Sequence, residues 1–191
     1  MELPVYLIGY MASGKTTVGK LLAQKLGWAF VDIDDAFEEL YGYTTGEYIR
    51  KYGLEAFRHK EKNCVEMLSE LPVQKVIYAT GGGYPCWEDN MECLKELGTS
   101  FYLRWKPEQL TERLFLSGIE HRPVAKEGML AAEGQTEREK MLNFVSRHLA
   151  ERRDYYEQAD FIIDAPEQLH ESNDELLAEQ ICTLIRKHYN K

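Results

Sequence analysis

Residues 9–17 read GYMASGKTT and match the Gly-x-x-x-x-Gly-Lys-Thr pattern of a phosphate-binding loop. The apolar run VYLI at residues 5–8 predicts a buried strand before the loop, and valine and leucine residues at helical spacing follow it. At such a junction of strand, loop and helix, backbone amides and the positive end of the helix dipole point at phosphate oxygens. The sequence therefore predicts an α/β protein that binds a nucleoside triphosphate together with Mg²⁺.

The loop supplies the predicted nucleotide contacts. Lys15 is expected to neutralise the β and γ phosphates, and the Thr16 hydroxyl is expected to bind Mg²⁺. Thr17 would contact a nearer phosphate or cap the helix. The predicted ATP-binding residues of the loop are Ala12, Ser13, Gly14, Lys15, Thr16 and Thr17.

Composition narrows the class of protein further. A length of 191 residues suits a single domain with small inserted lobes. The net charge of −9, with no cluster of lysine and arginine, argues against a nucleic-acid partner, and the cysteines and histidines show no metal-ligand spacing. No apolar run is long enough to span a membrane, and the first strand begins too early to leave room for a signal peptide. We therefore expect a cytoplasmic protein without a membrane partner. We also expect a monomer.

Apolar runs alternate with helical patterns along the chain, which predicts a parallel sheet covered by helices. The predicted strands are residues 4–8, 29–33, 75–79, 100–104 and 160–163. A helical insertion at about residues 35–71 is expected to form a substrate lobe. A second insertion, from residue 116 to about 135, contains Gly118, Gly128 and Gly134 and little periodic apolar content, so we expect a mobile loop or lid there.

Two carboxylates follow the second predicted strand. Because side chains two residues apart point to the same side of a strand, Asp32 and Asp34 are expected to face one site. Asp32 would lie near Mg²⁺, and Asp34 would orient the acceptor hydroxyl or act as its general base. The alternative is structural: Asp34 or Asp35 would cap the following helix.

Three consecutive glycines, Gly81, Gly82 and Gly83, follow the third predicted strand. Ordering them costs conformational entropy, which predicts that something approaches this backbone closely. Their amides could hold a substrate carboxylate or hydroxyl, or the water near the γ phosphate. A flexible turn leading to Pro85 is the alternative.

A helix that begins near residue 53 carries a candidate anion site. Glu61 is positioned to hold Arg58 as a preset fork for a small anionic substrate, with Phe57 as an apolar wall. The alternative is a surface ion pair that contributes little.

Three further arginines are candidate site residues. Arg152 lies on the apolar stripe of the helix that begins near residue 136, which predicts either anion binding or a buried ion pair, whereas Arg153 should face solvent. Arg122 lies within the expected lid, where it would either offset charge on the γ phosphate or remain a solvated loop residue. Arg113 is a candidate for stacking on adenine.

Taken together, the motifs resemble the shikimate kinase family, a group of small P-loop kinases with the plan of nucleoside monophosphate kinases. The resemblance covers nearly the whole chain, although Ala12 replaces a glycine that is frequent in the family's phosphate loop. The motifs that carry it are residues 9–17, Asp32-x-Asp34, Gly53-x-x-x-Phe57-Arg58-x-x-Glu61, Thr80-Gly81-Gly82-Gly83, Arg122-Pro123 and Arg152-x-x-x-Tyr156-x-x-Ala159.

The resemblance implies a three-layer αβα fold with strand order 2-3-1-4-5, a shikimate-binding lobe at residues 34–64, and a lid at residues 116–128 that closes over ATP. It implies transfer of the ATP γ phosphate to the 3-hydroxyl of shikimate in aromatic amino-acid biosynthesis. By the same resemblance, Lys15 and Arg122 would act on the transferred group, and Thr16 and Asp32 on Mg²⁺.

For the acceptor, the resemblance implies that Arg58, Arg152 and Gly82 bind the carboxylate and hydroxyls of shikimate, with Asp34 on the ring hydroxyls. Three other functions stay open at this stage. They are a kinase for another small acid such as gluconate, a nucleoside monophosphate kinase, and a non-catalytic binding module that responds to nucleotide.

Overall fold

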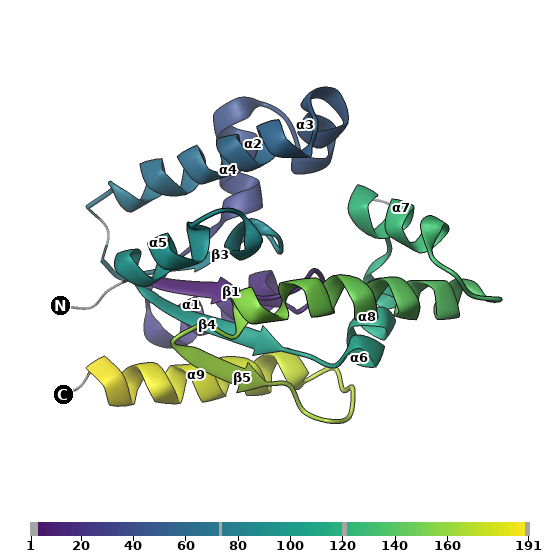
Figure 1. Cartoon of the computed structure of the whole chain (residues 1–191). Coiled ribbons are helices and arrows are strands. Elements are labelled where there is room, and N and C mark those ends of the chain that lie inside the picture. Colours follow the sequence, from purple (N-terminus) through teal and green to yellow (C-terminus); the bar gives the residue numbers. More distant parts are fainter. Residues whose placement is uncertain (1–3, 73, 120–121, 190–191) are drawn as a thin grey trace.

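A parallel five-stranded sheet forms the centre of the molecule, with strand order β2-β3-β1-β4-β5 (Figure 1). The computed structural model describes residues 4–72, 74–119 and 122–189. The strands are β1 (Val5–Ile8), β2 (Ala29–Asp32), β3 (Val76–Ala79), β4 (Thr99–Arg104) and β5 (Phe161–Asp164). Both the fold class and the strand order predicted from the sequence are confirmed, and each strand boundary differs from the expectation by at most one residue.

Helices cover both faces of the sheet. In Figure 1, α9 lies below the sheet and α5 and α8 lie above it, while α1 packs against α9. The helices are α1 (Lys15–Leu26), α2 (Ile33–Tyr41), α3 (Thr45–Tyr52), α4 (Leu54–Ser69), α5 (Asn90–Leu97), α6 (Pro107–Ser117), α7 (Pro123–Ala131), α8 (Glu137–Tyr156) and α9 (Asn173–Tyr189), and η1 (Tyr84–Cys86) is a short 3-10 helix. Within the described residues, none of the helices combines the length and apolar character that a membrane crossing requires.

Strand register places the predicted motifs at one edge of the sheet. Leu7 of β1 pairs with Ala79 of β3, and Ala79 pairs with Asp32 of β2. The carboxyl ends of β1, β3 and β2 therefore lie side by side, and the segments that follow them meet there. This is the edge at which open parallel sheets bind ligands.

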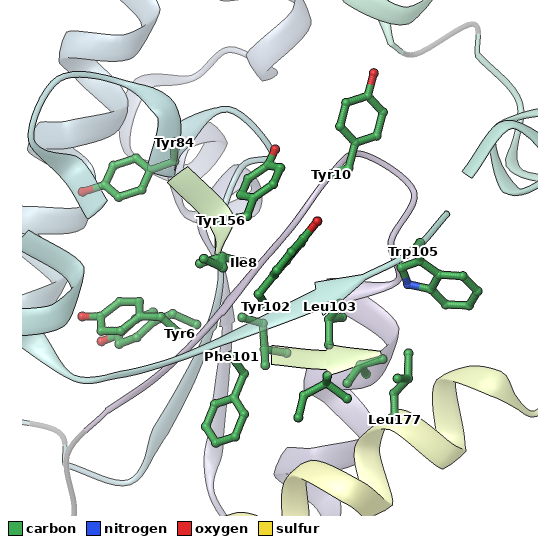
Figure 2. Close-up of a cluster of buried hydrophobic side chains, with 14 of the residues drawn as sticks. Tyr6, Ile8, Tyr10, Tyr84, Phe101, Tyr102, Leu103, Trp105, Tyr156 and Leu177 are labelled. Carbon is green, nitrogen blue, oxygen red and sulfur yellow. The ribbon is translucent and has the colours of Figure 1, made fainter. Parts of the chain in front are cut away.

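Strands β1 and β3 consist of apolar and aromatic residues without polar alternation because both of their faces are covered. Every residue of β1 and of β3 is buried, as expected for a parallel sheet between two helical layers. Figure 2 shows part of this core, where aromatic side chains including Tyr10, Tyr102 and Tyr156 gather near the ends of the strands. The rings of Tyr102 and Tyr156 stack with their centroids 5.1 Å apart.

Helices α2, α3 and α4 occupy the region of the expected substrate lobe and pack through aromatic rings. The Phe37 ring has its centroid 5.1 Å from that of Phe57 and 4.7 Å from that of Tyr41. The cluster joins α2 to α4 and holds the side of α4 that carries Arg58 toward the sheet edge. Figure 1 shows these three helices grouped away from the sheet.

The segment expected to be a loop between residue 116 and about 135 contains helix α7, so that expectation was wrong for residues 123–131. Ala125 and Met129 are spaced four residues apart and are buried. Gly128 was among the glycines that favoured a loop, but a Cβ atom at this position would lie 2.1 Å from the Phe144 ring. The glycine therefore permits close packing of α7 on α8. Residues 120 and 121 of the expected lid lie outside the described residues.

Candidate active site

A cavity of about 850 Å³ opens at the carboxyl edge of the sheet, a size typical of small-molecule sites. It brings together nearly every residue that the sequence predicted for the site. These are Ala12, Gly14, Lys15, Thr16, Thr17, Asp32, Asp34, Phe57, Arg58, Gly81, Gly82, Gly83, Arg113, Arg122 and Arg152. Ser13 is the exception, because its side chain is buried within the loop.

The phosphate loop holds its own lysine in place. The Lys15 ammonium group is buried and donates hydrogen bonds to the carbonyl oxygens of Gly9 and Tyr10, both at 2.9 Å, and to the Ser13 hydroxyl at 3.4 Å. Burial lowers the pKa of Lys15 to about 8, and the carboxylates of Asp34 and Asp32 oppose this shift. The group remains mostly cationic at neutral pH, as phosphate binding requires.

Two residues beyond the motif stabilise the loop from outside. The Trp105 indole donates from Nε1 to the Ser13 carbonyl at 2.9 Å, and Arg113 donates from Nε to the Ala12 carbonyl at 2.6 Å. The Arg113 guanidinium also lies over the Trp105 ring, at 4.4 Å from its centroid, and pairs with Asp174 of α9 at 3.0 Å. Trp105 was missed by sequence reasoning, because no local pattern connects it to the loop. Stacking of Arg113 on adenine stays a prediction.

Asp32 and Asp34 reach the cavity in a different way from the one expected. Strand β2 ends at Asp32, so Asp34 lies in the first turn of α2 and the two side chains do not share a strand face. The helix cap is Asp32, whose Oδ1 accepts a hydrogen bond from the Asp34 amide at 3.0 Å, and neither Asp34 nor Asp35 has that role.

The same Asp32 carboxylate contacts the phosphate loop. Its Oδ2 accepts a hydrogen bond from the Thr16 hydroxyl at 2.6 Å. Two hard oxygen donors side by side at the start of α1 suit Mg²⁺, which takes only one or two protein ligands when phosphates supply the others. The described part of the chain contains no cluster of three or more His, Cys, Asp or Glu side chains that could hold a metal ion.

The Asp34 carboxylate has an unusual electrostatic environment. Asp34 is an exposed residue, but it lines the cavity, and the protein around it removes part of the hydration of its carboxylate. This desolvation raises the pKa of Asp34 to about 6, Asp32 raises it further, and the cations Lys15 and Arg58 oppose the shift. A carboxyl group with a pKa near the working pH can accept a proton and release it again.

Arg58 and Glu61 form a buried ion pair. Arg58 Nη1 donates to Glu61 Oε2, and only 1% of the Glu61 side chain is exposed. Burial raises the pKa of Glu61 to about 7, and Arg58 opposes the shift. The weak surface pair considered from the sequence is therefore excluded, because Glu61 lies inside the protein and Arg58 lines the cavity.

The absence of side chains at the three glycines makes room for this ion pair, as it would for a ligand. A Cβ atom on Gly81 would lie 2.2 Å from Glu61 Oε1, and a Cβ atom on Gly83 would lie 2.1 Å from Arg58 Nη2. A Cβ atom on Gly82 would meet the Met11 amide nitrogen at 3.1 Å. The glycines leave space for charged side chains and for the phosphate loop, in agreement with the expected close approach to this backbone. Gly82 and Gly83 also form a turn before Pro85, so the turn of the alternative is present as well.

The two late arginines differ as the helical repeat predicts. Arg152 of α8 lines the cavity, whereas Arg153 is exposed and does not. Arg122 also lines the cavity, and its Nη1 donates to the Ser117 hydroxyl at 2.6 Å and to the Gly118 carbonyl at 2.9 Å. Burial lowers the pKa of Arg122.

Part of the cavity wall carries no motif that sequence reasoning could have used. Thr45, Gly46 and Ile49 come from α3, and residues 169–171 come from the connector that precedes α9. These residues reach the cavity only through the packing of the lobe and of the chain after β5. Tertiary structure, and no local pattern, places them there.

A phosphate loop with a buried lysine, a hydroxyl and a carboxylate beside the loop, and arginines that share one cavity with a second carboxylate are typical of a P-loop kinase that phosphorylates a small acceptor. Comparison with known proteins specifies this class. The chain matches the shikimate kinase family over residues 11–186 and belongs to that family.

Relatives and solved structures agree with this assignment. The shikimate kinase of Bacteroides fragilis is 35% identical over 184 residues, covering 96% of this chain and 97% of that protein. The crystal structure of shikimate kinase from Bacteroides thetaiotaomicron has a TM-score of 0.82 and 32% identity, and covers 96% of this chain and 98% of that one. A shikimate kinase from Acinetobacter baumannii in complex with shikimate has a TM-score of 0.78 and 29% identity. The match covers 99% of this chain and 96% of that one.

Proposed function

We propose that this enzyme of the shikimate kinase family transfers the γ-phosphoryl group of ATP to the 3-hydroxyl of shikimate, and that it uses Mg²⁺. One observation carries the acceptor assignment. Arg58, fixed by Glu61, and Arg152 line the same cavity as Asp34 and Lys15, so a carboxylate site and a proton acceptor face the phosphate loop together. A small hydroxy acid fits this arrangement, and the Acinetobacter baumannii relative in complex with shikimate supports the particular acid.

In the proposed reaction, Asp34 accepts the proton of the acceptor hydroxyl while the oxygen of that hydroxyl forms a bond to the γ phosphorus. The bond between that phosphorus and the β–γ bridging oxygen breaks, and ADP leaves. Lys15 and Arg122 offset the charge on the transferred group, and Thr16 and Asp32 would hold Mg²⁺, which would supply further positive charge to the phosphates. The amides of Gly81, Gly82 and Gly83 and the ring of Phe57 complete the acceptor side.

The inserted segments have proposed roles as well. Residues 34–64, with helices α2 and α3 and part of α4, would bind shikimate, and residues 116–128 would close over ATP. The adenine ring would lie against Arg113. We further propose that the protein acts as a monomer in the cytoplasm and has no nucleic-acid or membrane partner.

A panel of acceptors tests the proposal. The purified chain is incubated with ATP and Mg²⁺ and with shikimate, gluconate, AMP or CMP at equal concentration, and ADP and the phosphorylated product are measured by mass spectrometry. We expect rapid formation of shikimate 3-phosphate and slow reaction with the other acceptors. Faster turnover of gluconate or of a nucleoside monophosphate would overturn the assignment, as would tight ATP binding without transfer to any acceptor.

A further inference from the structure

One stripe of helix α8 contacts both sides of the cavity. Phe144, His148, Arg152 and Tyr156 recur every four residues and therefore lie along one side of the helix. Arg152 lines the cavity. The hydroxyl of Tyr156 donates to the Gly82 carbonyl on the acceptor side, and His148 contacts the phosphate loop on the nucleotide side. Arg152 is thus placed between two anchors one helical turn away on either side.

The nucleotide-side anchor is a hydrogen bond between Tyr10 and His148. Only 1% of Tyr10 is exposed, and its hydroxyl lies 2.8 Å from His148 Nδ1. Figure 2 shows the Tyr10 ring extending from the phosphate loop with its hydroxyl pointing away from the sheet. Burial, together with the cations Arg152 and Arg147, lowers the pKa of His148 to about 4. The neutral ring can therefore accept the hydroxyl proton at Nδ1.

The backbone of Tyr10 connects this anchor to the catalytic lysine. The Tyr10 carbonyl oxygen accepts a hydrogen bond from Lys15 Nζ at 2.9 Å, while the Tyr10 side chain is held by His148. A change in the position of Tyr10 therefore changes the position of an acceptor that holds the Lys15 ammonium group. No residue of the Gly-x-x-x-x-Gly-Lys-Thr pattern specifies this contact.

On its other side, His148 contacts Phe144 of its own helix, which leads to α7. Its ring stacks on Phe144, with centroids 4.9 Å apart and planes inclined by 30°. Phe144 in turn packs against Gly128 of α7, where a Cβ atom would lie 2.1 Å from its ring. A continuous set of contacts therefore runs from α7 through Phe144 and His148 to Tyr10.

We propose that His148 is a positioning residue for phosphoryl transfer, which holds Tyr10, and through its carbonyl Lys15, in the geometry that the reaction requires. The inference rests on the proposed function. Because Arg152 retains its second anchor through Tyr156, loss of the His148 contact affects the nucleotide side first. The rate should therefore change more than the shikimate requirement.

Four variants test the proposal in the full-length chain. His148→Leu removes the acceptor, Tyr10→Phe removes the donor, and the double variant removes both. His148→Asn restores an acceptor at about the distance of Nδ1 from the backbone. Arg153→Ala, on the exposed side of the same helix, is the control.

We expect His148→Leu and Tyr10→Phe each to lower kcat about 3- to 10-fold, a change typical of one lost hydrogen bond. The shikimate KM should stay within about twofold of that of the wild type. The double variant should be no slower than the slower single variant, because both remove the same contact. His148→Asn should recover most of the rate, and Arg153→Ala should leave it unchanged.

Three results would overturn the proposal: a lowered melting temperature with unchanged kcat, additive losses in the double variant, or no recovery in His148→Asn. Titration of ADP into the same variants separates this failure from failure of the proposed function. If the wild type does not phosphorylate shikimate, the function fails, yet weaker ADP binding by His148→Leu and Tyr10→Phe than by His148→Asn would still support positioning of the loop. Equal ADP affinity in all variants of an inactive protein would refute both proposals.

Discussion

The two sides of the cavity are built in opposite ways. On the nucleotide side, one contiguous stretch, residues 9–17, supplies most of the predicted contacts, and Lys15 donates to carbonyl groups of its own loop. On the acceptor side, charged side chains from α2, α4 and α8 meet around three glycines that leave almost no spare space. A local motif can be identified from sequence alone, whereas an assembled site depends on packing.

Lys15→Ala should separate the two sides most sharply. Loss of the cation that faces the developing charge should lower kcat by at least about 100-fold. The shikimate KM should change little, because Lys15 lies on the nucleotide side. Steady-state kinetics measure both values, with Lys20→Ala on the exposed surface of α1 as the matched control. Activity within twofold of wild type would remove Lys15 from the reaction.

Gly83→Ala tests the packing of the acceptor side. Its Cβ atom would displace the Arg58 guanidinium, and loss of a charge-assisted contact should raise the shikimate KM about 20-fold. The ATP requirement should stay nearly constant. Gly46→Ala is the control, because this cavity glycine has ordinary clearance, with its nearest neighbour at 3.5 Å. Equal shikimate KM values for the two variants would show that the glycine is not needed for Arg58.

The pH dependence of activity tests the electrostatic environment of Asp34. Asp34, with its pKa raised to about 6, must be ionised to accept the hydroxyl proton, so activity should fall as pH falls through 6. One pH unit below this value, kcat/KM for shikimate should be about 10-fold below its plateau. Asp34→Asn should abolish this acid limb together with most of the activity. An unchanged acid limb in this variant would show that another group causes the limb. Glu61, with its pKa raised to about 7, would then be the candidate.

Ala12→Gly should have the smallest effect. Ala12 adopts a left-handed backbone conformation with φ at 61°, which costs a residue with a side chain about 1 to 2 kcal/mol. Glycine avoids this cost but loses more chain entropy, so the net gain should be about 0.5 kcal/mol. Differential scanning calorimetry should show a rise in melting temperature of about 1 to 2 °C. A fall of that size would mean that the loop is not strained at this position.

The sequence predicted the fold and the location of the site because both depend on local patterns. Buried strands and the helical face of Arg152 follow from residue periodicity, the phosphate loop follows from its motif, and the order of the strands came from the family resemblance. Helix α7 was missed because its stability comes from close packing of Gly128 on Phe144, and an isolated glycine suggests the opposite.

The reason for the triple glycine and the contacts of Trp105 were also beyond local reasoning. Glu61 and Arg58 fill the space beside Gly81 and Gly83, and only the folded chain brings them there. Trp105 lies ninety-two residues from the Ser13 carbonyl that it holds. Contacts between distant segments have no signature in a single sequence.

Calorimetric titration of shikimate into the wild type, Lys15→Ala and Arg58→Ala in the absence of nucleotide tests the two-sided account most directly. Arg58→Ala leaves Glu61 without its partner and removes the fork for the acceptor carboxylate, so shikimate should bind at least about 10-fold more weakly. Lys15→Ala should bind shikimate within about threefold of the wild type. If Arg58→Ala binds as tightly as the wild type, or if both variants lose affinity equally, the account of a separate acceptor side built on Arg58 is wrong.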